Sequence, residues 1–318
     1  MKNPLRKRLL RELKSEFGKY LVIFLLLAGT ISLVSGFLVA DGSLLIAYNE
    51  GFERYNIEDG NFRLGEKANK AQLKSIRDLG VTVYDLFYAE KALTNGSTLR
   101  IYPNREQVDL VCLMQGAMPT SADEIAIDRM YADNNSLTIG DTLESGARSW
   151  TVTGLVALPD YSCLFRDNND SMFDAVKFGV AIVTPEMFED FSKDELYWNY
   201  AWKYDVKPAE GKSEQDAAED LMQGILNEAE LENFIPTYQN QAIQFTGDDM
   251  GGDKAMMVIL LYIVILIMAF VFGITTSNTI SKEANVIGTL RASGYTKNEL
   301  IRHYMTMPTI GTLTSALI

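Results

Sequence analysis

The chain has 318 residues, of which 47% are hydrophobic, and a net charge of −13. This acidity argues against a nucleic-acid partner, because phosphate binding needs a basic patch and none lies outside two short segments. The single histidine, His303, excludes HExxH zinc sites and, in the long acidic region before it, histidine-based triads and zinc clusters. We therefore expect no catalytic residues, metal or cofactor in this chain.

Residues 1–19 carry a charge of +5, and residues 20–40 contain no charged side chain. A bilayer core of about 30 Å needs roughly 20 apolar helical residues, so 20–40 is predicted to be a first transmembrane helix. A buried core helix and a cleaved signal peptide are the alternatives. The apolar run exceeds the roughly 7–15 residues of a signal peptide, and Leu38 before Ala40 spoils the cleavage pattern.

Small side chains recur every fourth residue in this segment, at Ala28, Ser32, Gly36 and Ala40. Such strips let the backbones of membrane helices approach closely. We interpret the strip as a helix-packing seam whose partner helix the sequence does not name. The alternative is that small residues are simply common in membrane helices.

Residues 41–254 are predicted to form an α+β domain in which two β-α-β units flank a β-rich insertion. The first unit is expected to have a helix over 67–79, then β-rich runs over 81–88 and 97–102. The second is expected to have a strand over 200–206, a helix over 213–229 and a strand over 234–238. The insertion, about 118–184, has predicted strands at 124–127, 137–143 and 150–154. This order favours one composite domain.

Three local features of this region bear on calcium binding, phosphate binding and disulfide formation. Asp167 to Asp170 resembles the opening of a calcium loop, but Met172 and Phe178 stand where glycine and glutamate are required. Residues 247–254 indicate a flexible polar hinge rather than a phosphate loop, because Asp253 stands where the lysine must be. The two cysteines, Cys112 and Cys163, are too few for a disulfide framework.

Residues 255–277 form the second predicted transmembrane helix, with no charged side chain from Met256 onward. Residues 278–303 carry +2, which leaves −20 between the basic flanks. The positive-inside rule places both flanks in the cytosol and residues 41–254 outside the cell. The chain is thus predicted to be an α-helical, multi-pass protein of the plasma membrane.

The segment after the second span reads as a short amphipathic helix. Glu283, Ile287, Leu290 and Gly294 fall on one helical face, and Gly294 is expected to end the helix. Lipid headgroups or a partner protein could cover the apolar side chains. The residues alone do not choose between these two.

This segment resembles the FtsX-like or MacB-like permeases of ABC transporters, whose pattern is a glutamate followed by an I-x-x-L-[RK]-A-x-G run. Here the matching residues are Lys282, Glu283, Ile287 to Gly294, and Leu300. A weaker likeness lies outside the membrane, where the β-rich insertion of such permeases is similar to these positions: Gly116, Pro119, Glu124, Ile125, Leu137, Gly140, Asp141 and Gly154.

The resemblance implies that a separate cytosolic ABC ATPase hydrolyses ATP and that the permease works as a dimer with a second subunit or half. It implies a coupling helix in which Glu283, Ile287, Leu290 and Arg291 dock on the ATPase. Gly288 would allow close approach, and Gly294 would end the helix. The second span would transmit nucleotide-driven motion to the external domain.

Residues 304–318 are expected to begin a third transmembrane helix. Because such permeases have four, we interpret the sequence as an N-terminal part that lacks the remaining helices. Two other functions are compatible with a membrane-anchored external domain. A two-helix sensor or anchored binding module predicts a cytosolic effector domain or a coiled coil after the second span, and an anchored enzyme predicts a catalytic constellation.

Overall fold

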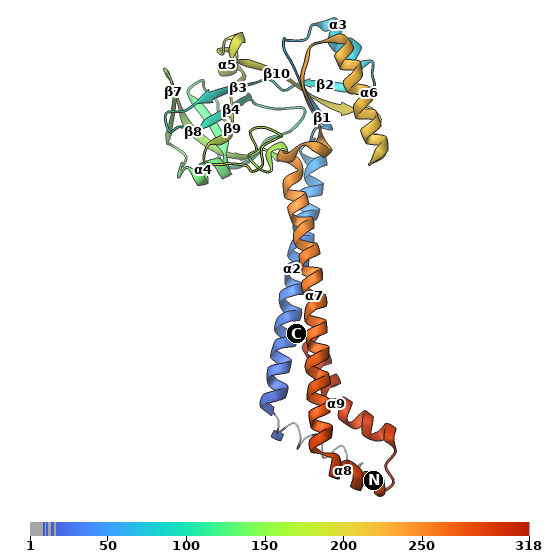
Figure 1. Cartoon of the computed structure of the whole chain (residues 1–318). Helices are drawn as coiled ribbons and strands as arrows, with labels where there is room; N and C mark the ends of the chain where they lie inside the picture. Colours follow the sequence, from blue (N-terminus) through green and yellow to red (C-terminus); the bar gives the residue numbers. More distant parts are fainter. Residues whose placement is uncertain (1–8, 10, 12–13, 16, 318) are drawn as a thin grey trace. The chain divides into compact units, whose positions relative to one another are not determined.

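A computed structural model describes residues 9, 11, 14–15 and 17–317 (Figure 1). The chain divides into two compact units, one comprising Met1–Leu45 with Met250–Ile318 and the other comprising Ile46–Asp249. We call the first the helical unit and the second the mixed-sheet unit, and describe each by itself.

The mixed-sheet unit begins and ends with two β-α-β units that share one sheet. Its strands follow the order β11-β1-β10-β2, and every neighbouring pair is antiparallel. This order, with a helix between the strands of each unit, is the split β-α-β arrangement, and it confirms that two β-α-β units flank the middle of the domain. The first strand, at Gly60–Leu64, was not predicted, and the predicted run over 97–102 belongs to the middle strands instead. The elements are β1 (Gly60–Leu64), α3 (Lys70–Arg77), β2 (Val81–Asp85), β10 (Leu196–Tyr204), α6 (Lys212–Glu228) and β11 (Leu231–Pro236).

Local sequence explains how α3 and α6 cover this sheet (Figure 1). Asn69 is the N-cap of α3, and its side-chain oxygen accepts hydrogen bonds from the Ala71 and Gln72 amides. The Gln72 side-chain oxygen accepts a hydrogen bond from the Asn69 amide, which completes the capping box. Ile76 of α3 and Ile225 of α6 are buried against strand residues. The inward face of the strands supplies an aromatic stack of four side chains, Phe62, Tyr200, Trp202 and Phe234.

The middle of the unit forms a second set of strands, in the order β3-β4-β9-β6-β8-β5, with β7 beside β8. Pairing is mixed: β4 runs parallel to β9 and β6 runs parallel to β8, whereas the other pairs are antiparallel. The elements are β3 (Tyr88–Ala92), β4 (Thr98–Pro103), β5 (Cys112–Gly116), β6 (Glu124–Asp128), α4 (Arg129–Asn134), β7 (Thr142–Ser145), β8 (Arg148–Ala157), η1 (Pro159–Tyr161), β9 (Phe178–Val183), α5 (Pro185–Glu189) and η2 (Lys193–Glu195).

The two sets of strands meet through β10, which pairs with β2 and β1 and also, through Tyr197 opposite Tyr88, with β3. The predicted run over 81–88 is therefore split into β2 and the start of β3. Leu86 and Phe87 make the crossing, and the Phe87 ring packs edge-on against Trp198 and Tyr200. β propensity is high on both sides of the break, so only this tertiary contact decides where it falls.

Other strand boundaries also move. Residues 137–141 form a turn, closed by Thr138 donating to Asp141, and only Thr142 onward is strand. The last strand of the unit begins at Leu231, earlier than predicted, and is followed by the short helix η3 (Thr237–Gln239). Thr237 is held by hydrogen bonds to the main chain of Glu58 and Asp59.

The predicted hinge over 247–254 is wrong, because these residues lie inside the helix α7 (Gln241–Lys282). A glycine costs about 1 kcal/mol in a helix, which favours a break. Here Tyr48 packs against the helix: its hydroxyl donates to the Ile243 carbonyl over 2.8 Å, and a Cβ on Gly247 would lie 2.8 Å from its ring. Gly247 thus leaves room for the Tyr48 ring and does not interrupt the helix.

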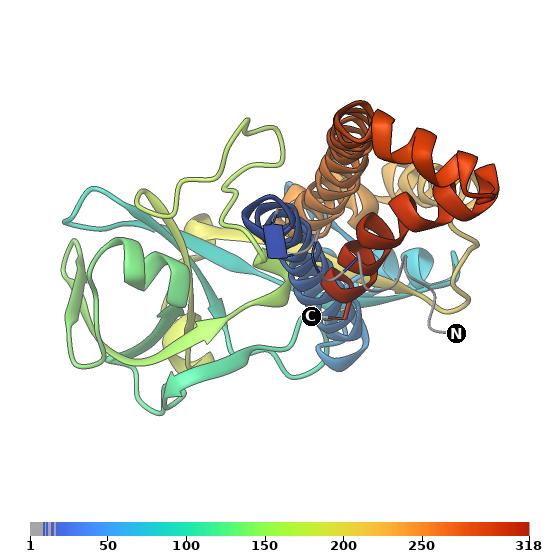
Figure 2. The ribbon, with the colours of Figure 1, turned by 90° about the horizontal axis from the view of Figure 1, so that it is seen from below.

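The helical unit contains most of α2 (Phe17–Arg54) and α7, followed by α8 (Ala284–Ala292) and α9 (Lys297–Ser315), which turns back after α8 (Figure 2). Among the described residues, α2 and α7 are the helices long and apolar enough to cross a membrane. Only 11% and 6% of their most apolar stretches are buried, so neither is the core helix of a soluble domain. Ile23 and Leu27 of α2 pack on Met268 of α7.

Candidate functional site

The predicted coupling segment folds as helix α8, separated from α7 at Glu283. Its end is a Schellman motif: the Tyr295 amide donates to the Leu290 carbonyl and the Gly294 amide donates to the Arg291 carbonyl, both over 3.1 Å. Gly294 has φ +96°, a left-handed conformation that L side chains adopt at a cost. The predicted end of the helix at this glycine is confirmed.

The proposed docking side chains differ in how much they are covered. Gly288, Arg291 and Gly294 are exposed, whereas Ile287 and Leu290 are half-buried. Ile287 lines an open apolar cavity of about 320 Å³ between α8, the end of α7 and α9. Apolar surface of this kind remains available for lipid or protein to cover.

Glu283 has a contact within the chain that the sequence did not reveal. It is half-buried, and its carboxylate accepts a hydrogen bond from the hydroxyl of Tyr304 in α9. Arg291 donates to the Tyr295 carbonyl over 3.2 Å, so its guanidinium also supports the turn after α8. Both charged positions thus fix the shape of the α8–α9 corner, whatever else they bind.

The small-residue strip of α2 lies mostly on an open face. Ala28 is buried, whereas Ser32, Gly36 and Ala40 are exposed, and a Cβ added at Gly36 would meet nothing within 4 Å. The contact of α2 with α7 uses larger side chains instead. The packing seam therefore stays a prediction for a helix other than α7.

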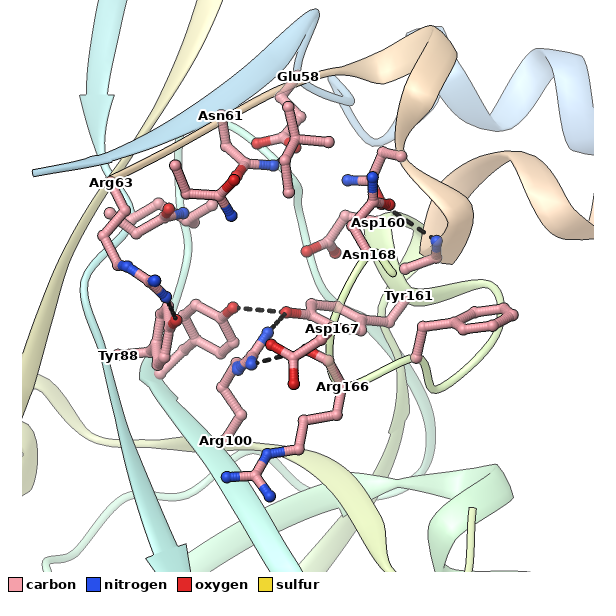
Figure 3. Close-up of a pocket in the computed structure, with 18 residues that line it drawn as sticks. Glu58, Asn61, Arg63, Tyr88, Arg100, Asp160, Tyr161, Arg166, Asp167 and Asn168 are labelled. Carbon is pink, nitrogen blue, oxygen red and sulfur yellow. Dashed lines mark hydrogen bonds between the residues drawn. The ribbon is translucent and has the colours of Figure 1, made fainter. Parts of the chain in front are cut away.

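A second candidate site is a polar cleft inside the mixed-sheet unit (Figure 3). It is a cavity of about 70 Å³, which has room for roughly five water molecules. Its walls come from widely separated segments and carry carboxyl, guanidinium and carboxamide groups, represented by Glu58, Asn61, Arg63, Arg100, Asp160 and Asn168. This size is well below the roughly 300–1,000 Å³ of pockets for drug-sized ligands.

Arg100 of β4 organises one wall of the cleft (Figure 3). Its guanidinium donates to Glu90 through two nitrogens, at 3.1 and 2.7 Å, and to the Tyr161 hydroxyl over 2.8 Å. Arg166 also donates to Glu90, over 2.7 Å. Burial alone would raise the pKa of Glu90, but the two guanidinium groups outweigh it and hold that pKa below its ordinary value.

Beside the cleft, a buried ion pair ties η1 to the loop after β4. The Arg105 Nη1 donates to both Asp160 oxygens, at 2.8 and 2.7 Å, and both side chains are about 95% covered. Asp109 and Glu58 lie next to this pair, and both are buried. Burial raises the pKa of Asp109 to about 7 and the pKa of Glu58 well above its usual range.

Sequence reasoning missed the cleft and its charged groups altogether. No motif links them, because they come from the segment after α2, from β1, β3, β4, β10, β11 and η1, from the loop after η1, and from the start of α7. Only the pairing of the two sets of strands brings them together. The sequence contains one weak indication of a buried polar site, which is that Arg100 lies in an otherwise apolar strand.

The structure also shows the surroundings of the calcium-like loop at 167–170 and of the two cysteines. Asp170 accepts a hydrogen bond from the Asp167 amide, and Asn168 binds the main chain of Gln239 and Gln241, so this loop is held by its own contacts. Cys112 and Cys163 are free thiols, the latter buried. Over the residues described, no cluster of three or more histidine, cysteine or acidic side chains could hold a metal ion.

Comparison with known proteins bears on the helical unit. Residues 258–318, which contain α8 and α9, match the FtsX-like permease C-terminal family. A crystal structure of the extracellular domain of the noncanonic ABC-type transporter YknZ, from Gram-positive bacteria, is similar over 54% of this chain and 100% of its own, with 14% identity and a TM-score of 0.28. At that TM-score the likeness adds nothing to the family match. No curated protein sequence matches the chain. The match over residues 258–318 supports the resemblance of this chain to the FtsX-like permeases of ABC transporters.

Proposed function

We propose that this chain is the permease subunit of an ABC transporter, in which a separate cytosolic ATPase drives movement of the domain at residues 41–254. The observation that carries this proposal is the family match over residues 258–318, because that segment includes the resembling motif at Glu283 to Gly294. ATP hydrolysis belongs to the partner, and the permease works with a second subunit or half in the plasma membrane.

Helix α8 is the docking element in this proposal. It is short, its ends are fixed by the Schellman motif and by Glu283, and much of its surface is exposed. Gly288 lies in the middle of the helix, and a Cβ added there would meet nothing within 4 Å. Gly288 then gives the ATPase access to the backbone of α8, while Val286 and Arg291 supply an exposed apolar side chain and a charge.

Transmission is assigned to α7, which continues without a break from Gln241 to Lys282. A continuous helix resists bending, so displacement at α8 would travel along it as a unit. The positive-inside charge pattern supports the same direction, from the cytosolic α8 to a domain outside the cell.

The sharpest test enlarges Gly288 without disturbing the chain itself. Gly288→Leu should fold normally, since the site is open and leucine favours helix more than glycine does. If α8 docks on the ATPase, the added side chain should cut co-purification of the co-expressed ATPase at least about tenfold, the effect of roughly 1.4 kcal/mol.

Gly251→Leu is the matched control, because Gly251 is also helical and equally open but lies far from α8 in the sequence. It should leave co-purification unchanged. Arg291→Glu should weaken binding in the same assay. Wild-type levels of ATPase with both Gly288→Leu and Arg291→Glu would refute α8 as the docking element.

A further inference from the structure

Three carboxyl groups and one guanidinium are buried together where the chain leaves α2. Glu58, Asp109, Asp160 and Arg105 are 2%, 0%, 4% and 9% exposed. They come from the segment after α2, the loop after β4 and η1. All four belong to the mixed-sheet unit.

The cation serves only one of the three acids directly. Arg105 places its Nη1 between both oxygens of Asp160 and also reaches the Asp109 main-chain oxygen, at 3.3 Å. The Glu58 amide donates to Asp109 Oδ1 over 2.9 Å, and Asn61 donates to Glu58 Oε1 over 2.6 Å. Within the described part of the chain, neither Glu58 nor Asp109 forms an ion pair.

The charges do not balance if every acid is ionised. Arg105 neutralises Asp160, which would leave two carboxylates buried beside each other without a cation, an arrangement that costs several kcal/mol. The remaining oxygens, Glu58 Oε2 and Asp109 Oδ2, are buried and accept no hydrogen bond. The bond from the Glu58 amide to Asp109 Oδ1 places the two residues next to each other, so one proton held by the two carboxyl groups would remove one of the two uncompensated charges.

We propose that Glu58 and Asp109 share one proton, and that release of this proton loosens the attachment of the segment after α2 to the loop after β4. The attachment is otherwise made by the main chain. Leu110 donates to the Tyr55 carbonyl over 2.8 Å and Asp109 donates to the Asn56 carbonyl over 3.2 Å. Asn56 and Asp109 have φ of +48° and +49°, a conformation that costs energy and is held by these contacts.

The other titratable and charged groups around the pair do not remove the imbalance. Asp160 adds negative charge and pairs with the Nη1 of Arg105. The Nε and Nη2 of Arg105 are buried without a hydrogen-bond partner among the described residues, and its guanidinium stacks 4.0 Å from the ring of Tyr102 on β4, so neither nitrogen reaches Glu58 or the Asp109 carboxyl. Lys203 of β10 donates its Nζ to the Ile57 carbonyl over 2.7 Å, so it supports the main chain of the same segment. Glu58 and Asp160 line the cleft, which gives water and protons access to the pair.

The direction of the pH effect follows from the raised pKa values, caused first by burial and then by the neighbouring carboxylates. An acid whose pKa is higher in the folded chain binds more protons there than when unfolded. The attachment is therefore strongest at acid pH and weakens as the pH rises through about 7, where Asp109 titrates.

The test uses the full chain in detergent and measures hydrogen exchange of residues 55–60 and 104–112, corrected for the intrinsic pH dependence of exchange. Protection should fall about tenfold or more between about pH 6 and pH 8 in the wild type. In Glu58→Gln and Asp109→Asn, which hold a neutral group at one position, protection should change little over that range. Asp123→Asn, at an exposed acid, should behave as the wild type does.

Infrared difference spectra of the chain with Glu58 and Asp109 in place give an independent reading if a variant does not fold. Burial also raises the pKa of Asp128, to about 6, so the spectra are recorded in an Asp128→Asn background, where they should show a protonated carboxyl at about pH 6 that is lost by about pH 8. Absence of that carboxyl, or unchanged pH dependence in both folded variants, would overturn the proposal. Because the measurement involves no ATPase, its failure would leave the docking of α8 untouched, and the result with Gly288→Leu would leave the shared proton untouched.

Discussion

The two units of this chain bury opposite kinds of side chain. The mixed-sheet unit encloses large aromatic groups such as Trp150 and Trp202 and places ion pairs such as Arg105 with Asp160 inside its core. The helical unit exposes its apolar side chains, including Val39 at 70% and Phe270 at 65%. Water surrounds the first unit, whereas lipid is the solvent expected around the second, where apolar exposure carries no penalty.

The difference teaches where each unit gets its stability. In the mixed-sheet unit, exact pairing of buried charges and close packing decide whether the fold holds, so small changes should have large effects. In the helical unit, α2 meets α7 through a few side chains around Ile23, Leu27 and Met268, and many positions have open space. Substitutions there should disturb partners rather than the fold.

The largest effect should follow from removing the buried cation. Arg105→Met leaves Asp160 without its bidentate partner and enlarges the charge imbalance with Glu58 and Asp109. Breaking a buried pair costs about 3–5 kcal/mol, so the free energy of unfolding should fall by that amount. Denaturant unfolding of the chain in detergent, followed by tryptophan fluorescence, measures it.

The matched control is Arg63→Met. Arg63 pairs with Glu232, but this pair is partly exposed, with side chains 27% and 46% accessible. Exposed pairs contribute roughly 0–1 kcal/mol. Equal losses in Arg105→Met and Arg63→Met would break the distinction between the buried and the surface ion pair.

An intermediate effect is expected from the same substitution placed in each unit. In Gly179→Ala, the new Cβ in β9 would lie 2.5 Å from the Tyr131 ring, which is held by hydrogen bonds of its hydroxyl to Ser97 and Asn95. Overpacking of this kind costs about 1–3 kcal/mol. Gly273→Ala in α7 meets nothing within 4 Å and should leave the unfolding of the mixed-sheet unit unchanged. Thermal unfolding of both variants compares them, and a larger loss with Gly273→Ala would contradict the contrast.

The smallest effect concerns the corner after α8. Gly294→Ala forces a side chain into the left-handed conformation, at about 1–2 kcal/mol. Hydrogen exchange of the α8 amides should then be roughly 5–30 times faster. Gly288→Ala, inside the same helix and without strain, should slow exchange slightly. Identical exchange in the two variants would show that the Schellman end does not hold α8.

Much of the fold could be read from local patterns. The apolar spacing over 67–79, and that of Leu221 and Ile225, predicted α3 and α6, and the uncharged runs predicted α2 and α7. The predicted secondary structure was wrong where one local pattern is compatible with two structures. The glycine-rich segment at Gly247 looked like a hinge, but it accommodates the ring of Tyr48, which is distant in sequence.

The two candidate sites also differ in how far the sequence predicted them. The α8 motif is contiguous, so the sequence located it and its end at Gly294, although the contact of Glu283 with Tyr304 required the fold of α9. The polar cleft has no contiguous signal. Its groups are ordinary arginines, asparagines and acids until β10 joins both sets of strands.

By itself the sequence determined the two apolar helices, their basic flanks, the two β-α-β units and the family motif, because each depends on residues close together along the chain. Only the tertiary structure decided which charges are buried together. The desolvation that raises the pKa of Asp109, and the shortage of positive charge beside three acids of which Arg105 pairs with one, exist only after residues 58, 105, 109 and 160 are enclosed in one place.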